Sequence, residues 1–249
     1  MDLNSPDTRQ MQLQARLSRG QPLNAAHIAL EFEVSPDTVR RDLIALERAG
    51  QARRVRGGAV PVARPAAPLE ERLETEVPPG LVAAALSVIG DAPTLLLDGG
   101  TTVLALAEAL PPDPGRLVVT PAPRVALACQ RRGIEVVLLG GTLSPRGGIA
   151  TGPGTEDQLT GIAADIAVLG ACGLEAEFGL GADDLAEAGV KRVMAQAAVR
   201  TMVLTGEGKV GRRARHRVIG CDQFADLVTD APEARTAAFA AAGVRVHHG

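Results

Sequence analysis

The sequence is poor in aromatic residues. Among its 249 residues there are four Phe and no Trp or Tyr, although 46% of the chain is hydrophobic. A hydrophobic core must therefore be built from Val, Leu, Ile and Ala side chains. Charged residues make up 22% of the sequence, which excludes the disordered and collagen-like classes of protein.

Long apolar runs and closely spaced cysteines are also missing. No uninterrupted apolar run reaches the ~18 residues of a membrane-spanning helix, and the acidic start from Met1 to Asp7 does not resemble a signal peptide. The three cysteines, Cys129, Cys172 and Cys221, are scattered without Cys-x-x-Cys spacing. This pattern predicts a reducing compartment, with neither disulfides nor a zinc site. We therefore expect a soluble, cytoplasmic protein that makes no membrane contact.

The charge is distributed unevenly along the chain. Residues 1–64 contain 10 Arg against 7 Asp plus Glu, whereas the remainder contains 16 basic and 22 acidic residues. A basic N-terminal part joined to an acidic remainder suggests that only the N-terminal part contacts a polyanion. The alternative is an ordinary solvated basic surface.

Proline marks a boundary between the two parts. Five of the 17 prolines fall between Val60 and Pro79. Each proline removes a hydrogen-bond donor and disfavours helix at the preceding residue. We predict a semi-stiff, Pro-rich linker at residues 61–79, with one helical turn near Leu69–Leu73. It separates an N-terminal domain, residues 1–60, from a larger domain, residues 80–249.

The N-terminal domain begins with two predicted helices. The stretch Arg9–Arg19 has apolar residues at helical spacing, and Gly20 and Pro22 stop it. Asn24 is a good N-cap for a second, short helix that ends near Phe32.

A third helix follows closely and has polar and apolar faces. Ser35 is its expected N-cap, Pro36 occupies the first helical position, and Asp37 complements the helix dipole. The predicted apolar face consists of Val39, Leu43 and Leu46. The residues that point away from it are Thr38, Arg41, Ala45 and Arg48. Small polar residues and Arg at the start of such a helix suit the DNA major groove.

Residues 52–59 predict a strand-turn-strand unit that carries Arg53, Arg54 and Arg56. Such a wing would place guanidinium groups along DNA phosphates. The alternative for the whole unit is a three-helix protein-interaction module with a solvated basic face.

A resemblance to a known family favours DNA binding. The matching residues are Val34-Ser35-Pro36, Thr38-Val39-Arg40-Arg41-Asp42-Leu43, Leu46-Glu47, Gly50, Arg53, Arg54 and Gly57-Gly58-Ala59. With them the chain strongly resembles the DeoR family of bacterial transcriptional regulators. The resemblance implies a winged helix-turn-helix on double-stranded operator DNA, with Ser35–Arg48 as recognition helix. The expected DNA-binding residues are Ser35, Asp37, Thr38, Arg40, Arg41, Arg48, Arg53, Arg54 and Arg56.

In the larger domain, short apolar runs alternate with helical segments. The expected strands are Thr94–Leu97, Leu117–Thr120, Glu135–Leu139, Ile166–Leu169, Met202–Thr205 and Leu227–Thr229. The expected helices are Thr102–Leu110, Arg124–Arg131 and Asp183–Val199. The alternation predicts a doubly wound, mostly parallel α/β domain. Ligands of such sheets bind beyond the carboxyl ends of the strands.

The loop Asp98–Thr102 follows one of these strands and begins a helix. Its two glycines allow successive N–H groups to point inward at the positive end of the helix, as in phosphate sites. It is neither a Walker A loop nor a dinucleotide fingerprint, and a plain turn is the alternative. The glycines at Gly140-Gly141 and at Gly170 and Gly173 also follow strands, and they are equally ambiguous alone.

Lysine is rare, since the chain contains only Lys191 and Lys209 beside 24 Arg. Their positions suggest a need for a compact ammonium group, although chance usage is the alternative. Glu187 and Lys191 lie four residues apart on one predicted helix, where a surface ion pair is the default. Near a sugar they would instead bind hydroxyl groups.

The family resemblance extends over the larger domain. It is carried by Leu97-Asp98, Gly100-Thr101-Thr102, Val118–Thr120, Leu139–Gly141, Gly152, Asp165–Ala167, Gly170, Gly173, Glu187, Lys191-Arg192, Lys209 and Gly211-Arg212. These residues are similar to the DeoR sensor domain, whose fold is similar to that of ribose-5-phosphate isomerase. The resemblance implies a phosphorylated sugar or sugar-alcohol effector. The expected effector-binding residues are Asp98, Gly100, Thr101, Thr102, Thr120, Gly140, Gly141, Glu187, Lys191 and Lys209.

Two positions depart from the family pattern. Pro121 stands where the family usually has Asn, and Gly206 stands where it usually has Asp three residues before Lys. The resemblance places both near the sugar hydroxyls. Their loss predicts weaker binding of a standard effector, or an effector that is smaller or differently hydroxylated.

The function expected from the sequence is a DNA-binding regulator of carbohydrate metabolism, a repressor controlled by a phosphorylated sugar. We expect a homodimer or higher homo-oligomer, because helix-turn-helix proteins usually pair on half-sites. No catalytic residue, metal or cofactor is expected, since His27, His216 and His247-His248 form neither a catalytic pair nor a metal cluster.

Two alternatives remain open. An isomerase-like enzyme requires a carboxylate base and a cation, and Glu187 and Lys191 are of those types. A constitutive DNA-binding protein with a vestigial sensor is the second alternative.

Overall fold

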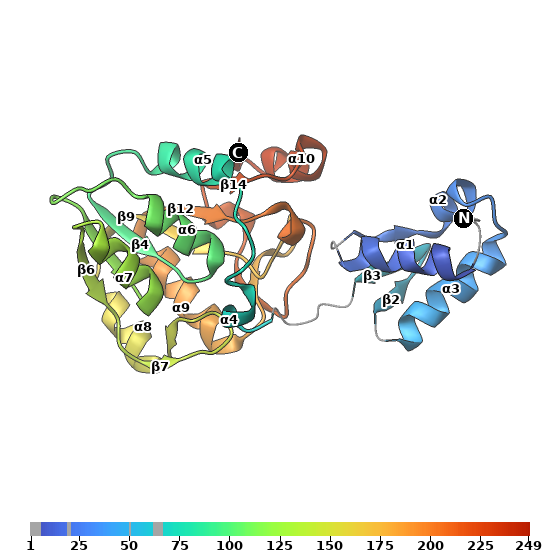
Figure 1. Ribbon diagram of the computed structural model, residues 1–249, viewed down its shortest axis with the longest axis horizontal. Coiled ribbons are helices and arrows are strands. Elements are labelled where there is room, and N and C mark those ends of the chain that lie inside the picture. Colours follow the sequence, from blue (N-terminus) through green and yellow to red (C-terminus); the bar gives the residue numbers. More distant parts are fainter. Residues whose placement is uncertain (1–5, 19–20, 50, 62–66) are drawn as a thin grey trace. The chain divides into compact units, whose positions relative to one another are not determined.

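The computed structural model describes residues 6–18, 21–49, 51–61 and 67–249 (Figure 1). The chain divides into two compact units, residues 1–64 and 65–249. The residues outside this description are 1–5, 19–20, 50 and 62–66. They include the expected helix end at Arg19 and Gly20, the family position Gly50 and part of the predicted linker.

The N-terminal unit has the winged helix-turn-helix fold. Its helices are α1 (Pro6–Ser18), α2 (Ala25–Glu31) and α3 (Pro36–Arg48), and its antiparallel sheet has the order β1 (Leu23–Asn24), β3 (Gly58–Pro61), β2 (Ala52–Val55). The predicted N-caps are confirmed. The Asn24 side chain accepts hydrogen bonds from the N–H groups of Ala26 and His27, and Ser35 Oγ accepts one from the N–H of Thr38.

The core of this unit fixes the orientation of α3. The apolar face predicted for this helix is buried, and it packs with Leu13 of α1 and Ile28 of α2. A buried ion pair between Arg9 and Asp42 also joins α1 to α3. The opposite face of α3 is left to solvent.

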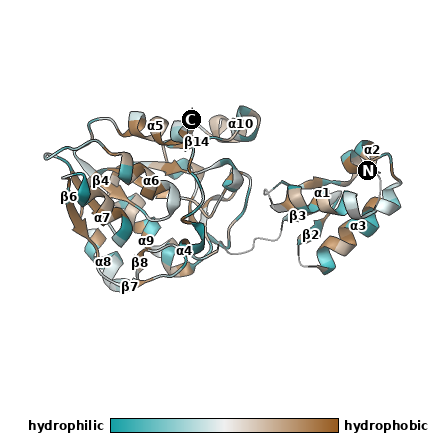
Figure 2. Ribbon diagram, viewed as in Figure 1, coloured by the Kyte–Doolittle hydropathy of each residue, from teal (hydrophilic) through white to brown (hydrophobic). Residues whose placement is uncertain are grey.

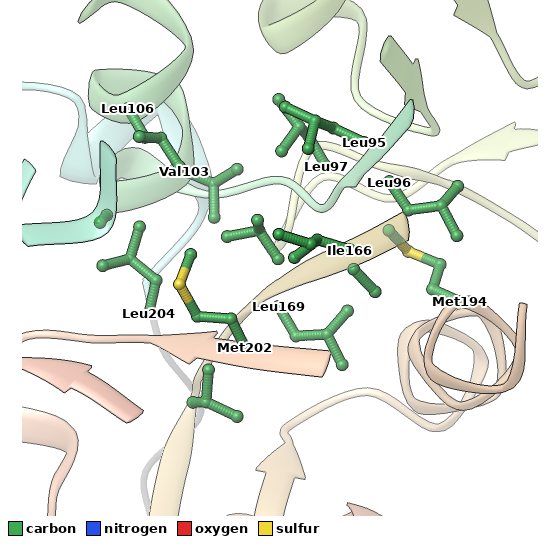
Figure 3. Close-up of a cluster of buried hydrophobic side chains, with 14 of the residues drawn as sticks. Leu95, Leu96, Leu97, Val103, Leu106, Ile166, Leu169, Met194, Met202 and Leu204 are labelled. Atoms are coloured by element: carbon green, nitrogen blue, oxygen red, sulfur yellow. The ribbon is translucent and has the colours of Figure 1, made fainter. Parts of the chain in front are cut away.

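The larger unit is built on a seven-stranded sheet in which every neighbouring pair is parallel. The order across it is β15 (Arg245–His248), β14 (Asp226–Thr229), β12 (Ala198–Leu204), β9 (Ala164–Gly170), β4 (Thr94–Leu97), β5 (Leu117–Thr120), β6 (Glu135–Leu138). Central strands need side chains that are apolar on both faces. Leu95, Leu96 and Leu97 meet this need and are fully buried among Ile166, Leu169 and Met202 (Figure 3).

The sheet is doubly wound, as predicted. From β4 the chain moves outward through β5 to β6, then returns to β9 and moves the other way through β12 and β14 to β15. Right-handed crossovers therefore place α6 (Thr101–Ala109) and α7 (Pro123–Arg131) on one face and α9 (Leu185–Gln196) on the other. The direction changes between β4 and β9, and their carboxyl ends are where such sheets bind ligands.

Other helices complete the two layers. Helix α5 (Pro79–Ile89) is mostly hydrophobic (Figure 2) and contacts α6, β14 and β15. The remaining helices are α4 (Leu69–Arg72), α8 (Pro153–Thr160), α10 (Glu233–Ala241) and the short 3-10 helices η1 (Glu207–Lys209) and η2 (Cys221–Gln223). No helix in the described ranges is both long and apolar enough to cross a membrane.

The helix predicted at 183–199 was too long at both ends. Asp184 is the N-cap of α9, which ends at Gln196, and Ala198 and Val199 already belong to β12. Ala198 pairs with Ala164 of β9, so sheet pairing rather than local preference decides this boundary. The sequence also did not predict the small antiparallel elements. They are the sheet β10 (Gly173–Glu175), β11 (Gly179–Ala182), β13 (His216–Ile219) and the hairpin β7 (Thr142–Leu143), β8 (Ala150–Thr151).

Candidate functional site

A cavity of about 340 Å³ lies at the switch point of the sheet. Its wall is formed by the loops that follow β4, β9, β12 and β14, by the first turn of α6 and by α9. Part of the loop between β7 and β8 and several residues between Arg72 and Leu81 complete it. Both the volume and the position are those of a small-molecule site, for which ~300–1,000 Å³ is usual.

The N-terminus of α6 opens into this cavity. Gly100 is its N-cap, with φ of +95°, and no side chain from the described part of the protein caps the helix. The first N–H groups of a helix have no partner within it, and they carry a partial positive charge. Gly99 allows a close approach, because a Cβ there would lie 2.4 Å from the Ile149 side chain. Together with the half-buried Thr101 and Thr102, which line the cavity, this end of α6 can accept an anion.

A buried ion pair lies beside it. Asp98 Oδ2 accepts hydrogen bonds from the Lys191 ammonium and, at 2.9 Å, from the N–H of Gly170. Lys191 also donates to the carbonyl of Gly170, at 2.9 Å. Burial is the largest single influence and lowers the pKa of Lys191, but the charge and hydrogen bond of Asp98, together with Cys172 and Glu187, outweigh it and the pKa is raised. Lys191 is therefore a permanent cation at neutral pH.

The default expectation of a surface ion pair between Glu187 and Lys191 was wrong. Both residues are buried, and Lys191 pairs with Asp98 instead. Glu187 Oε1 accepts hydrogen bonds from Ser144 Oγ and from the N–H of Gly147, the latter at 2.8 Å. Glu187 thus ties the loop between β7 and β8 to α9, and it lines the cavity.

One oxygen of Asp98 has no partner. Asp98 is fully buried, and its Oδ1 accepts no hydrogen bond from any residue that the structure describes. A buried polar atom left in this state costs ~1–3 kcal/mol. Because Asp98 lines the cavity, a hydroxyl or amino group of a bound ligand would satisfy it.

Lys209 is a cation available to an anionic ligand. Its side chain forms no hydrogen bond or ion pair within the described part of the chain, whereas Lys191 is committed to Asp98. Burial, followed by the positive charges of Arg212 and Arg72, lowers the pKa of Lys209. Arg212 donates to Asp183 Oδ2 at 2.8 Å. An anion in the cavity would relieve the repulsion around Lys209.

Three expected effector residues do not line the cavity. Thr120 is buried, and its hydroxyl donates to the carbonyl of Leu97 at 2.6 Å. Gly140 donates to the Gln158 side chain at 3.2 Å, and a Cβ at Gly141 would lie 2.1 Å from Thr155 Oγ1. The three residues thus support neighbouring loops. The other seven, which do line it, are Asp98, Gly100, Thr101, Thr102, Glu187, Lys191 and Lys209.

The two departures from the family pattern lie in different places. Gly206 lines the cavity, whereas Pro121 is buried away from it and its carbonyl accepts the N–H of Ala150 at 2.7 Å. A Cβ at Gly206 would lie 3.7 Å from Asp230 Oδ1. Asp230 also lines the cavity, so a carboxylate is present close to the position that lacks one.

Sequence reasoning missed several residues of the wall, among them Arg72, Cys172, Thr205 and Asp230. Thr205 ends one predicted strand and Asp230 directly follows another, so the rule that ligands bind beyond strand ends could have found them. Nothing in the local sequence indicates Arg72, because its place in the wall depends on how the segment before α5 folds back.

The exposed face of α3 carries the expected DNA contacts. Arg41 lies 2.7 Å from Asp37 and Arg40 lies 3.4 Å from it, and both guanidinium groups are largely exposed. Ser35 Oγ and Thr38 Oγ1 lie 2.9 Å apart at the helix start. Arg48, at the other end, is exposed.

The wing is joined to α3 through Arg54. Its Nε donates to Glu47 Oε2 at 2.7 Å, and its N–H donates to Glu47 Oε1 at 3.0 Å. These hydrogen bonds lower the pKa of Glu47. Arg53 and Arg56 are exposed and have no ion-pair partner among the described residues.

Within the same described residues no group of His, Cys, Asp and Glu could hold a metal ion.

Comparisons with known proteins agree with this division. The chain matches the DeoR-like helix-turn-helix domain over residues 9–64 and the DeoR C-terminal sensor domain over residues 81–231.

Curated relatives match most of the chain. The HTH-type transcriptional regulator GlpR of Haloferax volcanii is 30% identical over 79% of this chain and 78% of its own length. The glycerol-3-phosphate regulon repressor of Escherichia coli is 30% identical over 81% of each chain, and the HTH-type transcriptional repressor GlcR of Bacillus subtilis is 29% identical over 84% and 82%.

Among solved structures, a ribose-5-phosphate isomerase in complex with phospho-erythronic acid is 20% identical, with a TM-score of 0.39 over 57% of this chain and 54% of that chain. Because both family models match in order, and the winged helix and the parallel sheet follow each other as they require, the chain belongs to the DeoR family of DNA-binding transcriptional regulators.

Proposed function

We propose that the protein is a cytoplasmic repressor whose affinity for operator DNA is controlled by a small phosphorylated sugar or polyol. The cavity is the observation that supports a phosphorylated sugar or polyol as the effector. It combines the N-terminus of α6, the ammonium of Lys209 and a buried oxygen of Asp98, none of which has a side-chain partner among the described residues. The first two suit a phosphate group and the third suits a hydroxyl donor.

The two ends of the ligand have different surroundings. The phosphate is expected on the N–H groups of Gly100, Thr101 and Thr102, with Lys209 as counter-charge. The hydroxyl groups are expected at Asp98 and Glu187, which are held in place by Lys191 and Gly147. The curated relatives named for glycerol 3-phosphate support a short, three-carbon candidate.

Titration against the full chain tests this assignment. Thermal unfolding is measured with glycerol 3-phosphate, with several sugar phosphates and with their unphosphorylated parents. A ligand at 100 times its Kd stabilises the folded protein by ~2.7 kcal/mol. We expect a shift with a phosphorylated compound and none with its parent.

Two threonine variants locate the site. Thr101→Val removes a hydroxyl at the N-terminus of α6 and is expected to weaken binding about tenfold. Thr160→Val is the matched control, since the Thr160 hydroxyl is exposed on α8 and donates only to the carbonyl of Asp157. Equal binding of the unphosphorylated parent, or an unchanged Thr101→Val, would show that residues 98–102 are only a turn.

On the DNA side, α3 is expected to enter the major groove with Arg41 facing base edges and Arg40 near the backbone. Arg41 Nη2 is held by Asp37, which orients the guanidinium. If Arg41 contacts a guanine, Arg41→Ala should lower the preference for operator over random DNA by ~1–3 kcal/mol. Electrophoretic mobility shifts with both DNAs measure that preference, and an unchanged ratio would exclude Arg41 as a base reader.

An isomerase-like enzyme is the second candidate, and the cavity geometry favours the regulator. Lys191 is paired with Asp98, and Glu187 Oε1 is occupied by Ser144 and Gly147. Lys191, held by Asp98, is not placed to act on a substrate as an electrophile, whereas the second oxygen of Glu187 remains available to a ligand. Incubation with ribose 5-phosphate is expected to leave the sugar unchanged, and turnover would favour the enzyme.

A further inference from the structure

The segment between the wing and α5 forms part of the cavity wall. Residues that line the cavity include Arg72, Thr75, Glu76, Val77 and Pro78, although they precede α5 and the first strand of the parallel sheet. The same stretch of chain leads back to the DNA-binding unit. A ligand that contacts this wall therefore contacts the part of the larger unit that is nearest in sequence to the DNA-binding unit.

The segment is attached to the larger unit at several points. Leu69 is buried against Gly148, and its N–H donates to the carbonyl of Pro145 at 3.2 Å. Glu70 forms an ion pair with Arg124 of α7 at 2.7 Å, outside the cavity. The segment thus rests on the loop between β7 and β8, which Glu187 holds from the cavity side.

Arg72 joins these attachments to the cavity. Its Nε donates to the carbonyl of Ala67 at 2.8 Å, and one of its Nη atoms donates to the carbonyl of Arg146 at 2.7 Å. Among the described residues no carboxylate forms an ion pair with it. A guanidinium group has five N–H donors, so it retains donors for a ligand. Its charge also acts on Lys209, whose pKa it helps to lower after burial and Arg212.

We propose that Arg72 binds the phosphate of the effector together with Lys209. Ligand binding then holds the segment 69–78 against the larger unit, and through this segment it changes the DNA affinity of the N-terminal unit. The proposal rests on the phosphorylated effector proposed above. It adds to that site an anion-binding residue from the segment 69–78, and it gives a physical route by which the effector controls DNA affinity. Binding at Arg72 stabilises the segment in its attached state, and allostery requires such a difference between states.

The test uses the full chain, with inorganic phosphate and glycerol 3-phosphate as probes. Arg72→Gln removes the charge and keeps much of the side-chain length, so it should weaken both probes by about tenfold or more. Arg131→Gln, on the exposed end of α7, is the matched control and should bind as the wild type does. Arg72→Lys should recover part of the affinity, since an ammonium keeps the charge but not the planar fork.

Transmission is measured separately from binding. Glu70→Gln breaks the ion pair with Arg124 outside the cavity, so probe affinity should stay within about twofold of wild type, as for an exposed pair. The change in DNA affinity that the probe causes should fall several-fold. In the wild type, saturating probe should also slow tryptic cleavage after Arg72, followed by mass spectrometry, because cleavage requires the segment to detach.

The possible failures are distinguishable. If neither probe nor any sugar phosphate binds the wild type, the proposed effector class is wrong and the role of Arg72 falls with it. If the probe binds and Thr101→Val weakens it while Arg72→Gln binds normally, the effector stands and Arg72 is not a phosphate ligand. If Arg72→Gln binds weakly but the probe changes neither DNA affinity nor tryptic cleavage in the wild type, the segment does not transmit binding.

Discussion

Asp98 and Lys191 are separated by 93 positions in sequence and form a buried ion pair in the cavity wall. Lys191→Met should lower the free energy of unfolding by ~3–5 kcal/mol, because it leaves the Asp98 carboxylate buried without its counter-charge. Urea denaturation at pH 7 measures this loss. The double variant Asp98→Asn, Lys191→Met removes both charges and should recover most of it.

The pH range of that contribution follows from the raised pKa of Lys191. A lysine whose pKa rises on folding stabilises the protein fully below its ordinary value of 10.5, and loses that contribution only above it. The difference between wild type and Lys191→Met should therefore be constant from pH 6 to 9. If Lys191→Met were as stable to urea as the double variant, removal of the counter-charge would not be the cause of the loss and the prediction would be wrong.

In the wing, Arg53 and Arg54 are neighbours with different surroundings. Arg53 is exposed, whereas Arg54 is bound to Glu47 by both its backbone and its side chain. We expect Arg53→Gln to reduce the slope of log K against log salt by ~0.9, as for one lost phosphate contact. Arg54→Gln should leave that slope unchanged and weaken binding by loosening the wing. Equal slope changes would show that Arg54 also contacts phosphate.

At the scale of elements, the short helix η1 follows β12 and precedes β13 of the small sheet, and it places Lys209 in the cavity wall. The pKa of Lys209 lies below its ordinary value of 10.5, mainly because of burial. Its ammonium is therefore lost at lower pH than that of an exposed lysine. Phosphate affinity should fall as pH rises through this lowered pKa, toward 10.5.

The guanidinium of the Lys209→Arg variant keeps its charge over this range, because an arginine side chain is not deprotonated in proteins. Isothermal titration calorimetry measures phosphate binding to the wild type and to this variant between pH 7 and 10. Deprotonation of phosphate itself affects both proteins equally, so a difference between the two pH profiles reports deprotonation of Lys209. Parallel pH profiles would show that Lys209 does not contact the anion.

At the scale of the whole molecule, one recognition helix covers too little DNA for useful specificity. Helix-turn-helix proteins usually bind as pairs to half-sites about 10 base pairs apart. We predict a homodimer or higher homo-oligomer, joined mainly through the larger unit. Light scattering at micromolar concentration tests this, and a monomer would contradict it. Footprinting should show two protected half-sites at that spacing.

The sequence by itself determined those features that depend on neighbouring residues. The caps at Asn24 and Ser35, the buried face of α3 and the apolar strand ending at Leu97 were all predicted. Capping and periodicity act within a few residues, so their signals are written locally. The order of strands and helices then led to the doubly wound sheet, because crossovers have one hand.

Only the tertiary structure decided which distant residues meet. It paired Lys191 with Asp98 instead of Glu187, brought Arg72 into the cavity wall and left Thr120 outside it. These outcomes depend on which strands become neighbours and on how the segment before α5 packs. Ion pairs and cavities form between surfaces brought together by the burial of apolar side chains, a long-range effect without direction. The loop at the start of α6 and Lys209 were therefore visible in the sequence as candidate phosphate-binding positions, whereas the place of Arg72 in the same cavity wall was not.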